Sequence, residues 1–584
     1  MTHRKPPFQA AWLSALSLVS AACALSLASA TAMAAPAPAH ASAAATAKAA
    51  QAAAPRLVVF IAIDGLPMRQ VENNREYFGA DGFNRFLKGG TVYRDAHQEH
   101  GHTVTCAGHA AMLTGAYPQV TGIIANEWKN GLTGEEQYCA DDPAHTYIGN
   151  ATRKLAGTSP RRLHAETVGD VLLRERAGSK MIGISGKDRG AIMPSGKTGT
   201  AYMYMSDTGR FTSTTFYMKQ LPAWAEQFNG GQPANRFFGQ TWSLAQGPEA
   251  YRQSVPGGQP WQEDDGLGKT LPQRVVGKDA DKPDADYYKR LLSTPFADEL
   301  TLDFARAALA GEKLGQRGVT DLLSISLSAH DYISHGNGPE SQLTQDHLLH
   351  LDTMLGRFFR DLDKQLGRQR YTVVLTADHG FSDTPEWARS IGRDAGRVRD
   401  DVMLKAVNEA VSARFGEGQW AKATSAQGML FDLALIQARQ VQPAEVYETA
   451  KAALLKVDGV AQVYTEAQLQ DRGPTHDDIL ALMRRSYFAG ESGQLMMAYK
   501  AGWMQSKKTT GATHGSPYRD DTHVPILAWG PRWWKAADVE TRVHVVDIAP
   551  TLARVMGVSR PAQAQGTLLP EGQPKAAAKA KAAH

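Results

Sequence analysis

The nine residues LVVFIAIDG, numbered 57–65, contain the strongest structural signal in this chain. The first seven are apolar, and Asp64 follows them at once. Two more largely apolar runs occur far along the chain, at residues 322–327 and 371–376. Short runs of this kind are typical of strands that are buried on both faces of a parallel sheet.

Helical patterns lie between and after these runs. Apolar residues recur at spacings of three and four along residues 163–177, 342–366 and 401–415. Strands that alternate with helices predict an α/β fold in which helices sandwich a mostly parallel sheet. The segments at about 202–295 and 385–500 fall between these motifs, and we expect them to form cap insertions around the site.

The composition is that of an ordinary globular protein. Hydrophobic residues make up 43% of the 584 residues and charged residues 21%, which excludes a disordered chain, a collagen and a disulfide-dense miniprotein. The formal net charge is +4 at pH 7, which is too small for this length to favour nucleic acid as a dedicated partner.

Both ends of the chain predict segments outside the folded part. Residues 1–34 begin with His3, Arg4 and Lys5, continue with an apolar stretch and end in an Ala-Met-Ala cleavage site, as a signal peptide does. The alternative is an uncleaved membrane anchor, and no later run has the length of a membrane span. Residues 35–55 predict an Ala/Pro-rich linker and residues 563–584 a disordered tail, which leaves 56–562 as the folded domain. A cleaved signal predicts a periplasmic or secreted protein.

Each of the three apolar runs is followed by side chains that bind metal ions. Asp64 follows the first run, Asp331 and His335 follow the second, and Asp378 with His379 follow the third. Ligands of α/β sheets collect at the carboxyl ends of the strands, and aspartate with histidine suits zinc and other divalent ions. A single Asp after a strand more often closes a turn, and Asp331 with His335 also fits a helix pair four residues apart. The repetition at three strand ends favours a metal site.

A candidate nucleophile lies between the first and second runs. Thr105 stands in the segment 102–110, and small residues and a helical pattern follow, up to Gly115. A hydroxyl at a helix N-terminus meets free backbone N–H groups, which form a phosphate site, and a nearby metal ion would activate that hydroxyl. The alternative is a threonine that only caps the helix.

The order of these motifs resembles the alkaline phosphatase superfamily. The residues that carry the resemblance are Asp64, Thr105, Asn126, Asp331, His335, Asp378, His379 and His514. The segment Lys187-Asp188-Arg189 is similar to that of the PafA-type branch, whose members are periplasmic phosphate-monoester hydrolases with a Thr nucleophile. The resemblance covers essentially the whole of residues 56–562 and implies that this part is a catalytic domain with an alkaline phosphatase-like core.

The resemblance also implies roles for these positions. It implies two zinc ions per chain, one held by Asp331, His335 and His514. The second would be held by Asp64, Asp378 and His379, with Thr105 Oγ as the ligand that attacks phosphorus. Asn126, Lys187 and Arg189 would contact the phosphoryl oxygens.

The expected function is hydrolysis of small-molecule phosphate monoesters through a phosphothreonine intermediate. If the chain is extended at Lys187 and Arg189, both side chains face the same way and match a phosphate dianion better than a diester. One alternative is a phosphodiesterase or nucleotide pyrophosphatase of the same superfamily. Another is a non-catalytic protein that binds zinc or phosphate.

Two cysteines remain after the predicted signal cleavage. Cys106 and Cys139 are expected to pair in an oxidising compartment, and the alternative is two free, buried thiols. A bridge between them would exclude Cys106 as a competing nucleophile beside Thr105.

Overall fold

The computed structural model describes residues 54–149 and 156–574. The predicted signal peptide at 1–34, and nearly all of the linker at 35–55, lie outside the described residues. Within the described part, no helix combines the length and the apolar character needed to cross a membrane.

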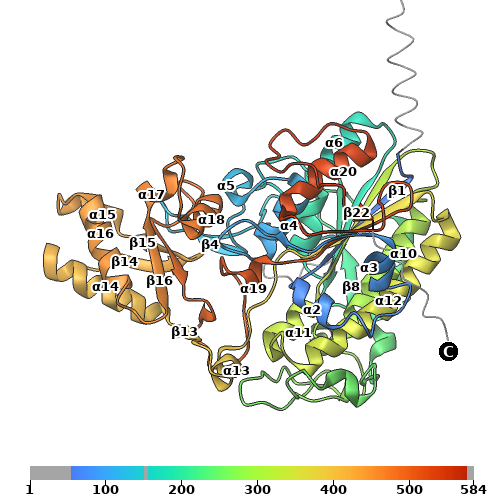
Figure 1. The fold of residues 1–584 in the computed structure, drawn as a ribbon, viewed down its shortest axis with the longest axis horizontal. Coiled ribbons are helices and arrows are strands. Elements are labelled where there is room, and N and C mark those ends of the chain that lie inside the picture. The colour runs from blue at the N-terminus through green and yellow to red at the C-terminus, as the bar shows by residue number, and fades with distance from the viewer. Residues whose placement is uncertain (1–53, 150–155, 575–584) are drawn as a thin grey trace, which may run out of the picture. The chain divides into compact units, whose positions relative to one another are not determined.

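A ten-stranded sheet forms the centre of the described structure (Figure 1). Its middle strands are parallel and adjacent: β1 (Leu57–Ile63) pairs with β11 (Asp321–Leu327) on one side and β12 (Tyr371–Thr376) on the other. Every residue of these three strands is buried, which explains why the sequence runs are apolar on both faces. The three strands predicted from the sequence are therefore confirmed to within one residue.

The remaining strands extend the sheet in both directions. The full order is β22 (Gln573–Pro574), β20 (Ala537–Val539), β2 (Thr91–Tyr93), β19 (Ile526–Trp529), β12, β1, β11, β6 (Met181–Ser185), β7 (Thr200–Met205) and β8 (Arg210–Thr212). Strands β6 and β7 run parallel to the centre, whereas β19 and β8 are antiparallel to their neighbours. The sheet is thus mixed and mostly parallel, as predicted.

Helices cover both faces of this sheet. Helices α6 (Val168–Glu175) and α20 (Ile548–Met556) lie on one side, and α10 (Pro295–Gly311) and α12 (Gln342–Leu366) lie on the other (Figure 1). The bounds of α12 match the predicted range; it begins after Ser341, whose side chain accepts a hydrogen bond from the Thr344 N–H, and ends at Gly367, whose φ is +82°.

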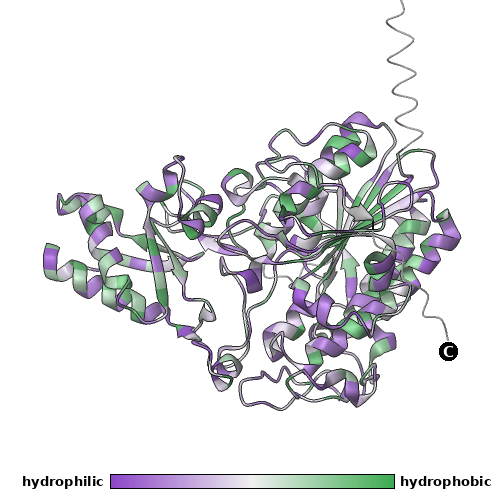
Figure 2. Cartoon of the chain, in the orientation of Figure 1, coloured by the Kyte–Doolittle hydropathy of each residue, from purple (hydrophilic) through white to green (hydrophobic). Residues whose placement is uncertain are grey.

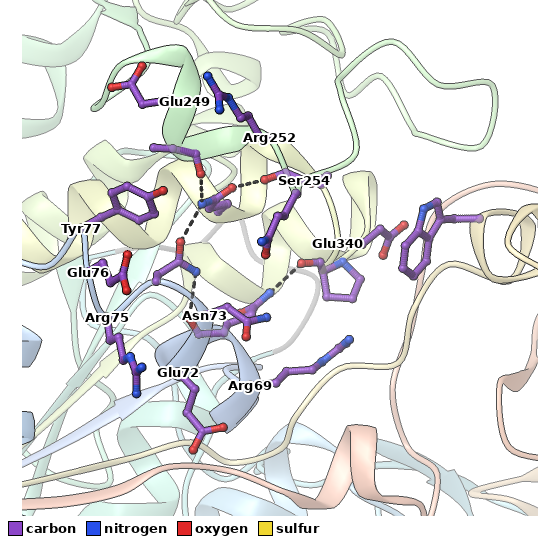
Figure 3. Close-up of a pocket in the computed structure, with 18 residues that line it drawn as sticks. Arg69, Glu72, Asn73, Arg75, Glu76, Tyr77, Glu249, Arg252, Ser254 and Glu340 are labelled. Carbon is purple, nitrogen blue, oxygen red and sulfur yellow. Dashed lines mark hydrogen bonds between the residues drawn. The ribbon is translucent and has the colours of Figure 1, made fainter.

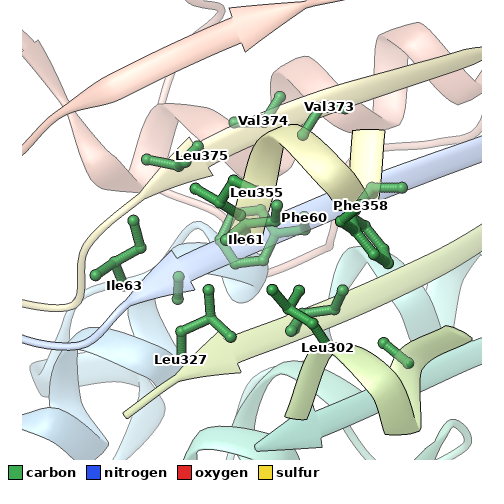
Figure 4. Close-up of a cluster of buried hydrophobic side chains, with 14 of the residues drawn as sticks. Phe60, Ile61, Ile63, Leu302, Leu327, Leu355, Phe358, Val373, Val374 and Leu375 are labelled. Carbon is green, nitrogen blue, oxygen red and sulfur yellow. The ribbon is translucent and has the colours of Figure 1, made fainter. Parts of the chain in front are cut away.

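The core between α10, α12 and the central strands is densely packed (Figure 4). Phe60 of β1, Leu302 of α10 and Leu355 and Phe358 of α12 are all 0% exposed. Burial of such side chains stabilises by about 1.5–3 kcal/mol each, and truncation of Leu355 to alanine would cost about 2–5 kcal/mol. This core holds the ends of β1, β11 and β12 in position.

A second, smaller sheet forms within residues 396–505, which we call the small-sheet region. Its order is β14 (Ala421–Ser425), β15 (Gly428–Phe431), β17 (Leu495–Tyr499) and β16 (Val460–Thr465), all antiparallel. Helices α14 (Asp400–Phe415) and α16 (Pro443–Leu454) pack on it around their own core of residues such as Val407, Trp420 and Val446. Both helices carry hydrophobic and hydrophilic residues along their length, as helices that cover one face of a sheet do (Figure 2).

The structure differs from two of the predicted boundaries. Residues 202–212 lie in β7 and β8 of the central sheet, so the chain leaves this sheet after Thr212 rather than at residue 202. The aromatic and methionine residues there are buried strand residues. The prediction of a disordered tail from residue 563 is wrong for residues 563–574: the Thr567 N–H donates to Asp547 Oδ1, and β22 pairs with β20. The Ala/Lys-rich composition that favours disorder begins only after residue 574, outside the described part.

Candidate active site

The carboxyl ends of β12, β1 and β11 bring Asp378, Asp64 and Asp331 together. Because the three strands are neighbours and parallel, they end at the same edge of the sheet. The turn after β1 requires a glycine: Gly65 has φ +73°, its N–H donates to Asp378 Oδ1 over 3.1 Å, and a Cβ there would lie 3.3 Å from Asp331 Oδ1.

The first group of candidate metal ligands consists of Asp64, Asp378 and His379, whose side chains are all 0% exposed. His379 Nε2 lies 3.4 Å from Asp64 Oδ1 and 3.5 Å from Asp378 Oδ2. The other ring nitrogen, Nδ1, lies 2.8 Å from the Gly380 carbonyl oxygen, so the neutral ring keeps its proton there and offers the Nε2 lone pair to a cation. We call this set the inner ligand group.

The second group consists of Asp331, His335 and His514. Asp331 and His335 stand one turn apart on α11 (Ala329–Asn337), and His514 comes from the loop after β18 (Trp503–Gln505). Asp331 Oδ1 lies 3.3 Å from His335 Nε2 and 3.6 Å from His514 Nε2. Backbone carbonyls hold both Nδ1 atoms, that of Ala512 at 2.9 Å and that of Thr103 at 2.8 Å. We call this set the outer ligand group.

The donor atoms of both groups fit divalent cations. Among the described residues, Asp64 Oδ1, Asp331 Oδ1 and His379 Nε2 are buried and have no hydrogen-bond partner. Buried polar atoms without partners are costly, and a set that converges on one place fits a cation site. Carboxylate oxygens and imidazole nitrogens are ligands of zinc. His379 Nε2 lies 3.9 Å from Asp331 Oδ1, so the two groups are adjacent.

The carboxylates and imidazoles perturb each other's ionisation. Burial opposes the charge of Asp378, but the neighbouring His379 and His109 outweigh it and hold the pKa of Asp378 below its usual range. Burial also opposes the charge of His379, but Asp378 and the other carboxylates raise the pKa of His379 to about 9. The pKa of His514 is well below its usual value because the ring is buried beside His379.

Thr105 is the first residue of α4 (Thr105–Thr114) and is 1% exposed. The helix packs closely on the end of β12, because a Cβ at Gly108 would lie only 2.0 Å from the Asp378 carbonyl oxygen. His109 of this helix contacts the ends of two strands: its Nδ1 lies 3.0 Å from Asp378 Oδ2, and its Nε2 lies 2.9 Å from Ser326 Oγ. The N-terminus of α4 therefore lies at the inner ligand group.

A disulfide joins Cys106 to Cys139, as predicted. Asn126 stands in the same place: its Oδ1 accepts a hydrogen bond from the Cys106 N–H over 2.8 Å, which leaves its amide Nδ2 as the donor. The bridge closes a span of 33 residues, and such a loop contributes about 3–4 kcal/mol in the chain-entropy model. It ties the start of α4 to the hairpin of β4 (Glu127–Lys129) and β5 (Glu136–Tyr138).

Lys187 and Arg189 are not two residues of one extended strand. The backbone is extended at Lys187, but α7 (Asp188–Ser195) begins at the next residue and ends the alternation on which the prediction rested. Lys187 Nζ lies 2.8 Å from Asp64 Oδ2 and 2.5 Å from Asp331 Oδ2, between the two ligand groups. Arg189 instead lines a cavity of about 430 Å³ together with Asn126.

Two tyrosines at the site were missed by the sequence analysis. The Tyr332 ring lies 4.9 Å from Lys187 Nζ, and the Tyr138 hydroxyl donates to Asp188 Oδ1. Each stands beside a residue that the sequence analysis did single out, Asp331 and Cys139, but a tyrosine in a loop or helix carries no functional signal of its own.

A second Asp/His cluster and a separate cavity contribute none of the candidate metal ligands described above. Asp95, His97 and His523 also converge, but Arg519 donates to Asp95 over 2.9 Å and already supplies the positive charge there. A cavity of about 880 Å³ is lined by side chains of both charges, including Arg69, Glu72, Arg75, Glu249, Arg252 and Glu340 (Figure 3).

The fold and the paired ligand groups at the end of a nucleophile-bearing helix define an alkaline phosphatase-like hydrolase. The sequence profile of the family "Type I phosphodiesterase / nucleotide pyrophosphatase" matches residues 58–518. Alkaline phosphatase PhoV of Synechococcus elongatus is 32% identical, over 88% of this chain and 92% of PhoV. The chain therefore belongs to the type I phosphodiesterase / nucleotide pyrophosphatase family, among its alkaline phosphatase-like members.

Alkaline phosphatase PafA provides a sequence and a structural comparison. PafA of Elizabethkingia meningoseptica is 29% identical, over 88% of this chain and 94% of PafA. A crystal structure of wild-type PafA superposes with a TM-score of 0.82 and 28% identity, over 89% of this chain and 99% of PafA. A second PafA structure, with a TM-score of 0.81, carries substitutions at a threonine, an asparagine, a lysine and an arginine.

Proposed function

We propose that this protein is an exported phosphate monoester hydrolase that uses two zinc ions and forms a phosphothreonine intermediate at Thr105. The observation that carries the proposal is the convergence of two adjacent ligand groups on the N-terminus of the helix that begins with Thr105. The relatives named alkaline phosphatase support it. The four residue types substituted in the PafA variant occur here in the same order as Thr105, Asn126, Lys187 and Arg189.

Each part of the chain has a defined task in this reaction. Asp64, Asp378 and His379 would hold one ion, and Asp331, His335 and His514 the other. Bound there, the ions would lower the pKa of the Thr105 hydroxyl and neutralise charge on the phosphoryl and leaving oxygens. Thr105 Oγ forms a bond to phosphorus as the bond to the leaving alkoxide breaks, and the alkoxide takes up a proton. Water then cleaves the phosphothreonine ester, which releases phosphate and restores the hydroxyl.

Donors around Thr105 orient the phosphoryl group. Asn126 Oδ1 is bonded to the Cys106 N–H, so the free Nδ2 of its amide would donate to a transferred oxygen beside the N-terminus of α4. Arg189 offers two N–H donors, which match two oxygens of a dianion better than the single charged oxygen of a diester. Lys187 is pinned between Asp64 and Asp331, so bound cations at the ligand groups would compete for those carboxylates and free its ammonium for the substrate.

Export is supported by the start of the sequence and by the disulfide. The signal-like residues 1–34 precede the folded part, and disulfides persist mainly in oxidising compartments.

The decisive experiment compares p-nitrophenyl phosphate with bis-p-nitrophenyl phosphate on the zinc-loaded protein at pH 8. We expect kcat/KM to be far higher for the monoester, and we expect Arg189→Ala to lower monoester turnover by about 10²- to 10³-fold but diester turnover much less. Atomic emission should find two zinc ions per chain.

A phosphodiesterase is the second candidate, because the matching family profile is described by that activity. A kcat/KM ratio below one would favour it and exclude the monoesterase. Equal losses for both substrates in Arg189→Ala would show that Arg189 does not select the monoester. Binding of zinc without turnover of either substrate would indicate a binding protein.

A further inference from the structure

The hairpin that joins β14 to β15 reaches the proposed site from the small-sheet region. Its two turn residues, Ala426 and Gln427, have φ values of +50° and +60°. Two-residue hairpins of this kind normally place asparagine and glycine at such positions, because other side chains are strained there. Strain of this kind persists where surrounding contacts impose it, and it gathers at ligand sites.

Contacts on both sides hold this turn in place. Ser425 Oγ accepts a hydrogen bond from the Lys129 N–H over 2.7 Å, and Ala426 packs against the hydrophobic cluster that includes Val104 and Ala125. The Gln427 carbonyl accepts from the Met497 N–H over 2.8 Å. The turn is therefore attached to the segment that carries the nucleophile as well as to its own sheet.

Gln427 is 7% exposed, and one of the two polar atoms of its amide has no hydrogen-bond partner in the part of the chain that the structure describes. Its Nε2 donates to the Gly515 carbonyl oxygen, which fixes the amide so that Oε1 points away from this carbonyl. Oε1 is buried and has no hydrogen-bond partner among the described residues. A buried amide oxygen without a partner costs free energy unless a ligand donates to it.

Gln427 stands between the phosphoryl side and the leaving-group side of the site. It lines the cavity of about 430 Å³ that contains Asn126 and Arg189, and also a cavity of about 480 Å³ that contains His514. Gly515, to which it is bonded, directly follows His514 of the outer ligand group. In an in-line displacement the leaving oxygen departs opposite Thr105. Because the Thr105 helix contacts Asp378 of the inner ligand group, the leaving oxygen would face the outer group.

We propose that Gln427 Oε1 contacts the leaving group and selects monoesters whose leaving group carries a hydroxyl donor, such as polyol, sugar or nucleoside phosphates. This inference rests on the proposed monoesterase function and adds a substrate class to it. The acceptor oxygen recognises a hydroxyl hydrogen on the leaving group and gains nothing from an alkyl or nitrophenyl group.

The test compares ethyl phosphate with 2-hydroxyethyl phosphate, which differ by one hydroxyl on the leaving group. We expect Gln427→Met to lower the kcat/KM ratio of the hydroxylated over the plain substrate by about 3- to 10-fold, the effect of one neutral hydrogen bond. Both substrates are measured on the same zinc-loaded preparation, so a loss of folded protein cancels from the ratio.

Gln505 provides a matched control, because it lines the same two cavities and both ends of its amide are already bonded. Its Oε1 accepts from the Tyr499 hydroxyl over 2.9 Å, and its Nε2 donates to Asp400. We expect Gln505→Met to leave the ratio unchanged. Gln427→Glu retains an acceptor oxygen and should keep the preference while its charge lowers both rates.

The outcomes separate this inference from the function on which it rests. Equal effects of Gln427→Met on both substrates, or the same shift in Gln505→Met, would overturn the role of Gln427 and leave the monoesterase intact. Failure of the wild-type protein to hydrolyse either substrate or p-nitrophenyl phosphate would overturn both.

Discussion

The inner and outer ligand groups offer similar donor atoms but are built in different ways. The inner group comes from the ends of two adjacent strands, β1 and β12, and all its side chains are 0% exposed. The outer group combines two residues of α11 with His514, a loop residue 179 positions beyond His335, and the His335 side chain is 38% exposed. A buried group on strand ends is rigid and slow to exchange, whereas a group completed by a loop depends on how that loop is held.

Hydrogen bonds from other segments hold the loop that carries His514. The His514 ring is fixed by the Thr103 carbonyl, and Arg397 of the small-sheet region donates to the Gly511 carbonyl over 2.7 Å. The outer group is thus coupled to the small-sheet region, and the inner group is coupled to the core of the central sheet. Four predictions test this difference.

The largest effect is expected at Thr105, which lies at the inner group without being one of its three convergent ligands. Thr105→Ala should lower kcat/KM for a monoester by about 10⁴- to 10⁶-fold, because it removes the only atom that attacks phosphorus. Zinc content should remain two per chain, as measured by atomic emission. Thr105→Ser restores a hydroxyl and should keep most of the activity; an inactive serine variant with full zinc content would contradict the assignment.

Substitution of one histidine in each group should separate the groups. His379→Ala and His335→Ala should each lower activity at least about 100-fold, since each removes a metal ligand. Excess zinc should restore part of the activity of His335→Ala, because a half-exposed site admits a replacement water, and none of that of His379→Ala. Equal rescue of both variants would show that burial does not distinguish the groups.

Removal of metal by a chelator should proceed in two steps. The ion of the outer group should leave first, at least about tenfold faster, because one of its ligands, His335, is reached from solvent. Stopped samples would be analysed for zinc and for activity, and activity should be lost with the first ion. Arg397→Met removes the hydrogen bond to the Gly511 carbonyl and should accelerate only the loss of the outer-group ion. Faster loss of both ions would contradict the proposed difference between the two groups.

The smallest effect concerns the stability of the metal-free protein. The pKa of His379 is raised to about 9, so the folded protein binds a proton there that the unfolded protein loses at about pH 6.5. The stability that His379 contributes is complete below about pH 6.5 and is lost as the pH rises through 9. His514, whose pKa is lowered, contributes nothing over this range.

Thermal unfolding of the chelated protein measures this contribution. We expect the melting temperature to fall by a few degrees between pH 6.5 and 9, and we expect the fall to be smaller in His379→Gln. An identical slope in the variant would show that other groups account for it.

Much of the inner half of the site can be derived from local sequence. A strand buried on both faces must be apolar throughout, and the first polar residue after it must lie at the edge of the sheet; this places Asp64 and the pair Asp378 and His379. Thr105 is also marked by its neighbours, because the small residues that follow it begin a helical pattern and place its hydroxyl at a helix N-terminus. The spacing of Asp331 and His335 is also a local property, since residues four apart share one face of a helix.

Local sequence could not place the groups that depend on distant contacts. Nothing near His514 marks it as a ligand: it meets Asp331 because the loop after β18 folds back over α11. The direction of Lys187 depends on where α7 begins, one residue after it, and on the carboxylates of Asp64 after β1 and Asp331 on α11. Gln427 reaches the site only because a separate sheet packs against β4 and the loop after His514.

One physical cause separates the features that local sequence predicts from those that only the tertiary structure determines. Strand burial and helix periodicity act over a few residues, so their consequences can be read along the chain: the central strands, the ligands at their ends and the helix that begins with Thr105. The outer ligand group, the orientation of the cations and the rim of the cavity arise from contacts between segments separated by about a hundred residues or more. Such contacts depend on packing of whole elements, which single-residue patterns do not encode.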